Sequence, residues 1–352
     1  MNSPATAPKV TKETKNKIRV DFERTDFWTR FKLKYLSLNF FVTLMWVIFR
    51  FVLLVGISYV ILSPVLSKVF SSFMGQEDFV DVTVKYIAKH PTWDTYKALI
   101  LESKYFTALF NTAILSLFCA VVQTFICCVV AYGFAKFKFK FNNLLFFLVI
   151  FTMVVPHETL QLSMFLRFRF FDVLGIMKLL GGGVFDWLNI TGGVQSINLL
   201  NTYWPLAILS FGGLAFKNGL YIFMLRQYFK GVPDELEESA YLDGSGVFRT
   251  FFQIIIPLSV PMMITVFIFA FSWQWTDMFY TELFFTKSSI TMMPDIVKTI
   301  PASLNVQYAG KVMRDAAIFN TGSLLIIAPL IVMYLFCQRY LIAGIERSGI
   351  TG

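Results

Sequence analysis

The chain alternates between long apolar stretches and short polar segments along most of its length. A helix needs about 20 mostly apolar residues to cross the hydrocarbon core of a bilayer. Six stretches meet this requirement, at about 46–66, 106–132, 143–166, 202–225, 258–280 and 316–337. The pattern therefore predicts an all-α polytopic membrane protein with about six transmembrane helices in one membrane domain.

Two of the six stretches contain residues that interrupt a helix. The fourth carries Gly212, Gly213 and Lys217, so we expect it to be broken or tilted. The third carries Pro156 directly before His157, where the helix either breaks at a functional position or simply kinks.

The N-terminal 45 residues are more polar and basic than the rest of the chain. Residues 1–20 are expected to form a disordered arm. Segment 26–44 mixes aromatic and basic residues, which predicts an amphipathic helix on the membrane surface. No short apolar core of a cleavable signal peptide is visible, so we expect the first apolar helix to direct insertion. The chain thus divides into a cytoplasmic arm with an interfacial helix, 1–45, and a transmembrane domain, 46–352.

Composition supports a bilayer as the natural solvent. Hydrophobic residues make up 56% of the chain and charged residues only 15%, with a mean hydropathy of +0.64, whereas soluble domains are about 25% charged. The net charge of +9 gathers in the N-terminal 50 residues and in short loops. This distribution is typical of cytoplasmic loops facing anionic lipid rather than of nucleic-acid binding.

The cysteines and histidines do not form a metal-binding pattern. All four cysteines lie inside apolar stretches, where small buried side chains are the simplest interpretation; they are Cys119, Cys127, Cys128 and Cys337. Only two histidines occur, so neither a metal site nor a histidine-based catalytic triad is expected.

The distribution of Lys and Arg predicts the orientation in the membrane. Basic residues are most frequent before the first stretch, and Lys136, Lys138 and Lys140 crowd the short loop after the second. Because cytoplasmic loops carry the excess of Lys and Arg, both termini are expected to be cytoplasmic. Residues 67–105 and 167–200 then form long outer loops.

The most informative polar segment lies between the fourth and fifth stretches, at about 230–257, and we call it the elbow. Pro233 lies where a helix starts, and four acidic residues follow, which complement the N-terminal end of a helix dipole. Gly244 permits a sharp turn, and a second amphipathic piece is expected from Val247 to Ile256, ending at Pro257. The elbow is therefore predicted to be a cytoplasmic helix–turn–helix.

Two interpretations of the elbow remain open on physical grounds. One is an ordinary amphipathic loop on the lipid headgroups, although its acidic start would be repelled by anionic lipid. The other is a docking surface for a partner protein, because one small apolar face consists of Leu236, Ala240, Tyr241 and Leu242.

The elbow resembles the EAA signature of permease subunits in binding-protein-dependent ABC importers. In that signature Glu-Ala-Ala is followed by three residues, Gly, nine residues and Ile-x-Leu-Pro. This sequence matches the spacing at every step, with Ser in place of the first Ala and Ile in place of Leu, at Glu238-Ser239-Ala240, Gly244, Ile254, Ile256 and Pro257. Further stretches resemble the shorter permease of the maltose-type carbohydrate family, at 92–137, 218–233, 235–244 and 338–345.

This resemblance implies a fold, a mechanism and a set of partners. The chain would be one permease subunit of a sugar or oligosaccharide importer in a bacterial inner membrane. Its elbow would dock into a separate ABC ATPase through Glu235, Glu237, Glu238, Ser239, Ala240, Tyr241, Leu242, Asp243, Gly244, Ile254 and Pro257. The remaining partners would be a second permease, an extracellular or periplasmic solute-binding protein and membrane lipid.

The expected cofactors belong to the partner ATPase. The sequence lacks the phosphate-binding motif G-x-x-x-x-G-K-[ST], so this chain is not expected to bind ATP or to be an enzyme. ATP and Mg²⁺ would bind to the ATPase dimer, and alternating access would follow from a shift between its arrangements.

Polar residues inside the apolar stretches are candidates for the substrate path, because they are costly in a membrane and usually functional. They are Asn111, Gln123, His157, Glu158, Gln161, Trp273, Gln274, Trp275 and Asp277. The tryptophans would also suit an aromatic belt at the membrane surface.

Two other classes of function fit the sequence less well. An ion-coupled secondary transporter would often show repeated halves, which the sequence does not show, and the elbow would have no role. A membrane-embedded metalloprotease would need H-E-x-x-H, but Gln161 stands where the second His belongs. Residues 176–198 look like an addition without an assigned role.

Overall fold

The computed structural model describes Trp28, Gly175 and residues 38–172, 196–215, 217–287 and 290–349. Apart from two isolated bridge pairs, the regular structure in this part of the chain is helical. The prediction of an all-α protein is therefore confirmed. The arm expected at 1–20 and most of the addition at 176–198 lie outside the described residues.

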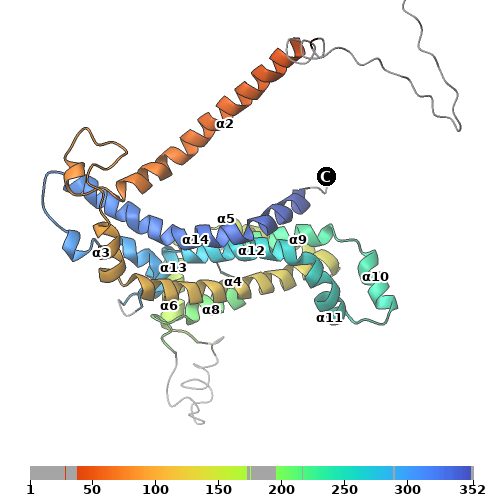
Figure 1. Ribbon diagram of the computed structural model, residues 1–352. Helices are drawn as coiled ribbons and strands as arrows, with labels where there is room; N and C mark the ends of the chain where they lie inside the picture. The colour runs from red at the N-terminus through yellow and green to blue at the C-terminus, as the bar shows by residue number, and fades with distance from the viewer. Residues whose placement is uncertain are drawn as a thin grey trace, which may run out of the picture. The chain divides into compact units, whose positions relative to one another are not determined.

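Figure 1 shows the helices in chain order. The α-helices are α2 (Leu38–Ser71), α3 (Asp94–Glu102), α4 (Tyr105–Lys136), α5 (Asn142–Val154), α6 (Gln161–Arg169), α8 (Trp204–Phe211), α9 (Asn218–Lys230), α10 (Glu235–Leu242), α11 (Val247–Thr250), α12 (Ile256–Trp275), α13 (Phe279–Phe284) and α14 (Lys311–Gly349). Short 3-10 helices are η1 (Glu77–Phe79), η2 (His157–Leu160), η5 (Met293–Val297) and η6 (Ala302–Leu304), and η4 (Phe251–Ile255) is a π-helical turn.

Several of these helices are suited to cross a membrane. In the described residues, four are long and apolar enough, at Phe41–Ser71, Tyr105–Lys136, Val247–Trp275 and Lys311–Ile342. A bent pair, Asn142–Val154 with His157–Arg169, would make a fifth. The fourth predicted stretch is divided between α8 and α9, each too short to cross alone. The multi-spanning character is confirmed, and the count of six stays a prediction.

The chain forms two compact units, Met1–Ser67 and Lys68–Gly352. In the first, α2 runs without a break from Leu38, so the boundary expected at residue 45 does not coincide with a helix end. The surface helix over 26–44 stays a prediction, because most of that segment lies outside the described residues.

The third apolar stretch is broken at Pro156, as the sequence allowed. α5 ends at Val154, and Val155 is extended at φ −71° and ψ 117°, which is typical of a residue before proline. Helical structure resumes at His157 in a direction bent by 93°. The stretch is therefore two short helices at a steep angle rather than one kinked span.

The fourth stretch is interrupted where Gly213 and Lys217 adopt left-handed backbone conformations, with φ of +67° and +65°. Glycine takes this conformation without steric cost, whereas a lysine there is uncommon. α8 ends at Phe211 and α9 begins at Asn218. The predicted interruption is confirmed.

The core of the second unit forms where α4 packs against α9 and α12. α4 contributes small side chains that are fully buried, including Ala120, Cys127, Cys128 and Ala131. Tyr221, Leu225 and Phe229 of α9 and Met262 and Val266 of α12 complete the cluster. Small residues let helices approach closely in a membrane, so Cys127 and Cys128 serve as packing residues, as predicted. Cys119 is also buried, whereas Cys337 is only half-buried and does not fit the prediction.

The expected end of the second elbow helix at Pro257 is wrong. Helical structure continues from Val247 through η4 into α12, and Pro257 lies in the first turn of α12. Proline has no N–H to donate to the preceding turn, and the wider π turn lies directly before it. The continuous helix ends at Trp275 rather than near 280.

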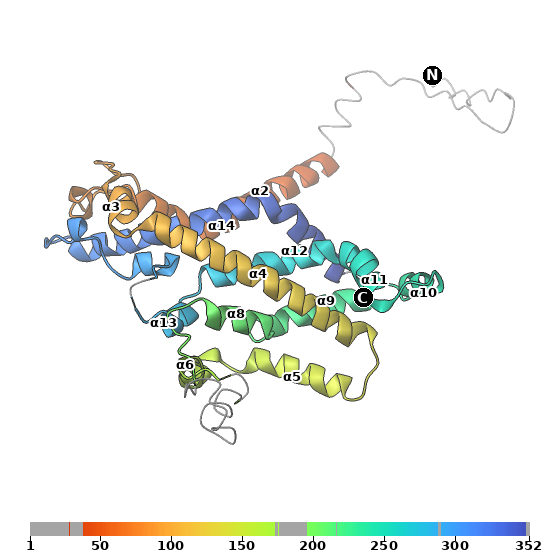
Figure 2. The same ribbon diagram turned by 90° about the horizontal axis from the view of Figure 1, so that it is seen from below.

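Figures 1 and 2 show how the second unit is arranged. α4, α9 and α12 lie side by side, with α10 and α11 at one end of these helices and α13 toward the other. The elbow and the segment after α12 are therefore at opposite ends of the packed core.

Candidate functional site

The turn of the elbow is a helix C-terminal motif built on Gly244, whose φ is +82°. The Gly244 N–H donates to the Tyr241 carbonyl at 3.0 Å, and the Ser245 N–H donates to the Ala240 carbonyl at 2.9 Å. This pair of bonds is the Schellman arrangement, which favours glycine at the left-handed position. Gly244 therefore ends α10 and turns the chain toward α11, as predicted.

The two faces of α10 have different surroundings. Glu237 and Ala240, one turn apart, are buried against the chain itself. The outward candidates are Glu235, Glu238, Ser239, Tyr241, Leu242 and Asp243, of which Leu242 is 89% exposed. Ala240 is therefore not available to a partner. The exposed apolar face of α10 consists of Leu236, Tyr241 and Leu242.

The remaining coupling candidates lie after the turn. Ile254 is half-buried in η4, and Pro257 is exposed at the start of α12. These two residues belong to the long helix that begins at Val247 rather than to α10.

Side chains of α4 hold the inward face of α10. Lys136 Nζ donates to the Val232 carbonyl at 2.7 Å and to Asp234 Oδ1 at 2.6 Å, and lies 3.6 Å from Glu237 Oε1. The Tyr132 hydroxyl donates to Glu237 Oε2 at 3.2 Å. The hydrogen bond from Lys136 holds the pKa of the Asp234 carboxyl below its ordinary value.

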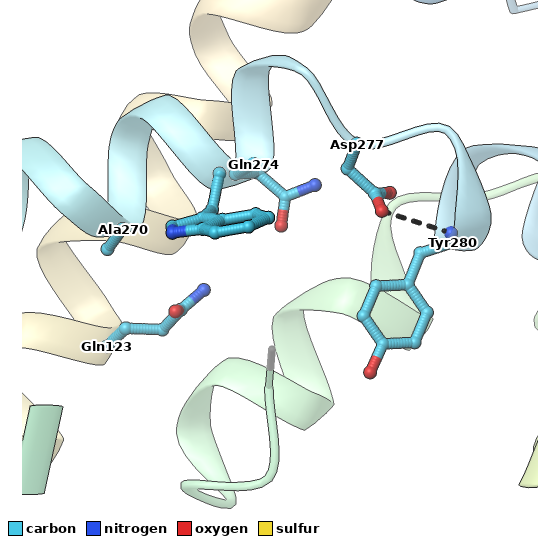
Figure 3. A pocket seen from close by; sticks show the side chains of 6 residues that line it. Gln123, Ala270, Gln274, Asp277 and Tyr280 are labelled. Carbon is cyan, nitrogen blue, oxygen red and sulfur yellow. Dashed lines mark hydrogen bonds between the residues drawn. The ribbon is translucent and has the colours of Figure 1, made fainter. Parts of the chain in front are cut away.

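A small pocket lies near the other end of the core (Figure 3). It is lined by Gln123, Ala270, Trp273, Gln274, Asp277 and Tyr280. Gln123 comes from the middle of α4, is buried, and donates from its amide to Ser210 Oγ at 3.3 Å. Asp277 accepts the backbone N–H groups of Tyr280 at 3.3 Å and Thr281 at 3.1 Å, so its carboxylate orients the start of α13.

Helix breaks converge on this pocket. His157, at the break after α5, lies with Nδ1 2.7 Å from the Tyr280 hydroxyl. Lys217, at the break before α9, lies with its ammonium 5.0 Å from the centre of the Trp273 ring. Interrupted helices inside a membrane are tolerated where they line a cavity or are buried in protein. The arrangement offers hydrogen-bonding groups and an aromatic ring beside irregular backbone.

The structure brings together four of the path candidates, Gln123, Trp273, Gln274 and Asp277. Trp275 lies elsewhere, buried with its indole N–H donating to the Ile326 carbonyl at 2.9 Å. Asn111 donates to the Thr291 carbonyl at 3.0 Å. Glu158 and Gln161 are exposed outside the pocket lining.

Sequence reasoning missed Tyr280, Ala270 and Ser210 as neighbours of the path candidates, and treated Lys217 only as a helix interruption. A tyrosine near the end of an apolar stretch is typical of a membrane interface, so the sequence offered no separate signal for Tyr280. Among the described residues, no three His, Cys, Asp or Glu side chains gather so that they could hold a metal ion.

Comparisons with known proteins find similarity to permease proteins of transport systems. Residues 123–347 match the family described as "Binding-protein-dependent transport system inner membrane component". The probable ABC transporter permease protein YurM of Bacillus subtilis is 28% identical over 88% of this chain and 89% of its own length. The maltodextrin transport system permease protein MalD of Streptococcus pneumoniae is 28% identical over 85% and 93%.

Two further similarities extend the comparison. The galactooligosaccharides transport system permease protein GanQ of Bacillus subtilis is 26% identical over 87% of this chain and 95% of its own. Among solved structures, a chain of a bacterial ABC transporter involved in the import of the acidic polysaccharide alginate is similar, with a TM-score of 0.59 and 19% identity. The similarity covers 84% of this chain and 96% of that one, which shows a shared fold.

Proposed function

Because the chain belongs to the family of inner-membrane components of binding-protein-dependent transport systems, we propose that it is a permease subunit of an ATP-driven importer of a sugar or an oligosaccharide. The names of similar permeases support this substrate class, since they include maltodextrin and galactooligosaccharide systems. The single observation that carries the mechanism is the elbow, a helix–turn–helix with an exposed acidic and apolar face.

The energy for transport comes from another polypeptide. This sequence has no G-x-x-x-x-G-K-[ST] motif, so ATP and Mg²⁺ bind to a partner ATPase. The outward face of α10 docks there, with Glu238 offering charge-assisted hydrogen bonds to basic groups. Leu242 and Tyr241 supply exposed apolar surface beside it. The elbow and both termini lie on the cytoplasmic side.

The pocket near α13 is this subunit's share of the translocation path. Gln123, Gln274 and Asp277 supply groups that hydrogen-bond to hydroxyls, and Trp273 supplies a ring for a sugar face. A second permease subunit provides the opposite wall, and a solute-binding protein delivers the substrate from outside. Alternating access follows when ATP binding favours one arrangement of the ATPase over another.

Co-purification from native membranes in mild detergent tests the proposal. We expect a P-loop ATPase and a second permease to remain bound to the chain, and the ATPase to be lost in Glu238→Lys. The matched control is Glu77→Lys, which reverses an exposed glutamate in η1 and leaves the ATPase bound. If the wild-type chain emerges alone and still transports actively, the proposal fails and an ion-coupled carrier becomes the better account.

A further inference from the structure

The segment 232–245, which contains α10, is tied to the rest of the structure by α4. Among the described residues, each side-chain hydrogen bond or ion pair that joins this segment to another helix comes from Lys136 or Tyr132. The Lys136 side chain is only 7% exposed and the Glu237 side chain 10%. Lys136 therefore places its ammonium beside three oxygens of the segment, on Val232, Asp234 and Glu237.

The buried contacts of Glu237 contribute more to this attachment than the exposed contact of Asp234. Exposed ion pairs contribute little because water screens them, and the Asp234 side chain is 78% exposed. Glu237 is different, because its carboxylate is buried with Tyr132 on one oxygen and Lys136 near the other. Removing one partner of a buried pair leaves a charge without compensation and is strongly destabilising. Glu237 thereby holds α10 in one position against the end of α4.

α4 is also the less interrupted route from the elbow to the pocket. It is one helix from Tyr105 to Lys136 without an internal proline. At about 1.5 Å per residue, the pocket residue Gln123 lies about 20 Å along the helix from Lys136. The covalent route into α12 instead passes the Gly244 turn and η4, followed by Pro257 and Pro261. Glycine turns, π turns and prolines are the places where helical chains bend.

We infer that α4 carries the movement of α10 to the pocket, and that Lys136 and Tyr132 are the positioning residues that join α10 to it through Glu237. The inference rests on the proposed docking of α10 on the ATPase. A push on α10 then moves the α4 backbone as one rigid helix, and Gln123 changes its position in the pocket. The adjacent Glu238 faces outward. Glu238 therefore contacts the ATPase, whereas Glu237 in the same turn attaches α10 to α4.

The test compares Lys136→Met with wild type in the complete complex, reconstituted in liposomes with its co-purified partners. ATP hydrolysis and uptake of a radiolabelled maltodextrin are measured together, and the readout is sugar transported per ATP. We expect this ratio to fall about tenfold in Lys136→Met, within the usual range of coupling between sites. The ATPase remains bound, because the outward face of α10 is unchanged. Lys136→Arg keeps a cation at this position, so its ratio is expected to stay close to the wild-type value.

Control variants separate transmission from folding. Lys138→Met removes an exposed lysine two residues away and leaves the ratio at the wild-type value. The double variant Lys136→Met/Glu237→Leu removes the unpaired buried charge, so it regains thermal stability while its ratio stays low.

Two results would overturn the inference. One is a wild-type ratio in Lys136→Met with the ATPase bound, and the other is full recovery of the ratio in the double variant. Failure of the wild-type chain to retain any ATPase would instead refute the proposed function itself.

Discussion

His157 Nδ1 lies 2.7 Å from the hydroxyl of Tyr280, and this hydrogen bond joins the break after α5 to the helix that follows α12. The Tyr280 ring stacks on Phe284 at 5.7 Å between centroids. Tyr280 thus anchors the broken third stretch beside Asp277, at the wall of the pocket.

Replacing Tyr280 with phenylalanine tests this anchor. Tyr280→Phe keeps the ring but removes the hydroxyl, so we expect a loss of about 1 kcal/mol in stability. The apparent midpoint of thermal unfolding in detergent should fall accordingly. Tyr203→Phe is the control, because among the described residues no hydrogen bond is found for its hydroxyl and its ring packs on Phe285. Equal midpoints for the two variants would show that the bond to His157 contributes nothing.

Gly244→Ala tests the turn of the elbow, because it adds only a β carbon. A β carbon added at Gly244 would meet no atom within 4 Å, so the expected effect comes from its φ of +82° alone. A left-handed conformation costs a residue with a side chain about 1–2 kcal/mol, and this strain reorients α10. We therefore expect weaker retention of the ATPase during purification.

Gly246→Ala is the matched control for that experiment. Gly246 also has open space around it, but its φ is −80°, which any residue adopts. It should retain the ATPase like the wild type. Loss of the ATPase in both variants, or in neither, would contradict the role assigned to the Gly244 conformation.

Substitutions of Trp273 and Trp275 are expected to affect different properties, sugar uptake for the first and stability for the second. Trp275→Phe removes a buried indole N–H from the Ile326 carbonyl, which costs about 1–3 kcal/mol of stability without changing the sugar preference. Trp273→Phe changes a 46% exposed ring at the pocket, so its effect should appear in the KM for sugar uptake. Uptake kinetics and thermal unfolding of both variants separate the two roles. A changed KM only in Trp275→Phe would reverse the assignment.

The bond between Lys136 and Asp234 should be insensitive to pH in the physiological range. The pKa of Asp234 is lowered below its ordinary value of 3.8 by the hydrogen bond from Lys136. A carboxyl with a lowered folded pKa contributes its stability above the unfolded value and loses it as the pH falls through the folded value. The small difference in thermal unfolding midpoint between Asp234→Asn and wild type should therefore stay constant between about pH 5 and pH 8. A difference that disappears within this range would show that Lys136 does not keep this carboxyl ionised.

Local chemistry predicted the places where the helices break. Pro156 interrupts a helix because proline restricts the conformation of the residue before it. Gly213 and Gly244 follow helix ends because glycine adopts the left-handed conformation without steric cost. These features depend on a few neighbouring residues, so they are readable from a sequence. The continuation of the helix past Pro257 was missed because the π turn before it has no simple sequence signal.

The division of roles within α10 could not be predicted in this way. Glu237 and Glu238 are identical neighbours, and only packing against α4 decides that the first is buried and the second exposed. The contacts of Glu237 with Tyr132 and of Tyr280 with His157 each join residues more than 100 positions apart. Such pairings follow from the tertiary arrangement, which the apolar pattern alone does not specify.

Sugar uptake by liposomes tests most directly whether the chain is a subunit of an ATP-driven importer. The chain is reconstituted with its co-purified partners, and uptake of a set of radiolabelled sugars and oligosaccharides is followed with ATP on the side of the elbow. We expect uptake that requires ATP and the partner subunits, and that persists when ionophores collapse every ion gradient. Uptake by the chain alone, driven by an ion gradient without ATP, would contradict the proposed function.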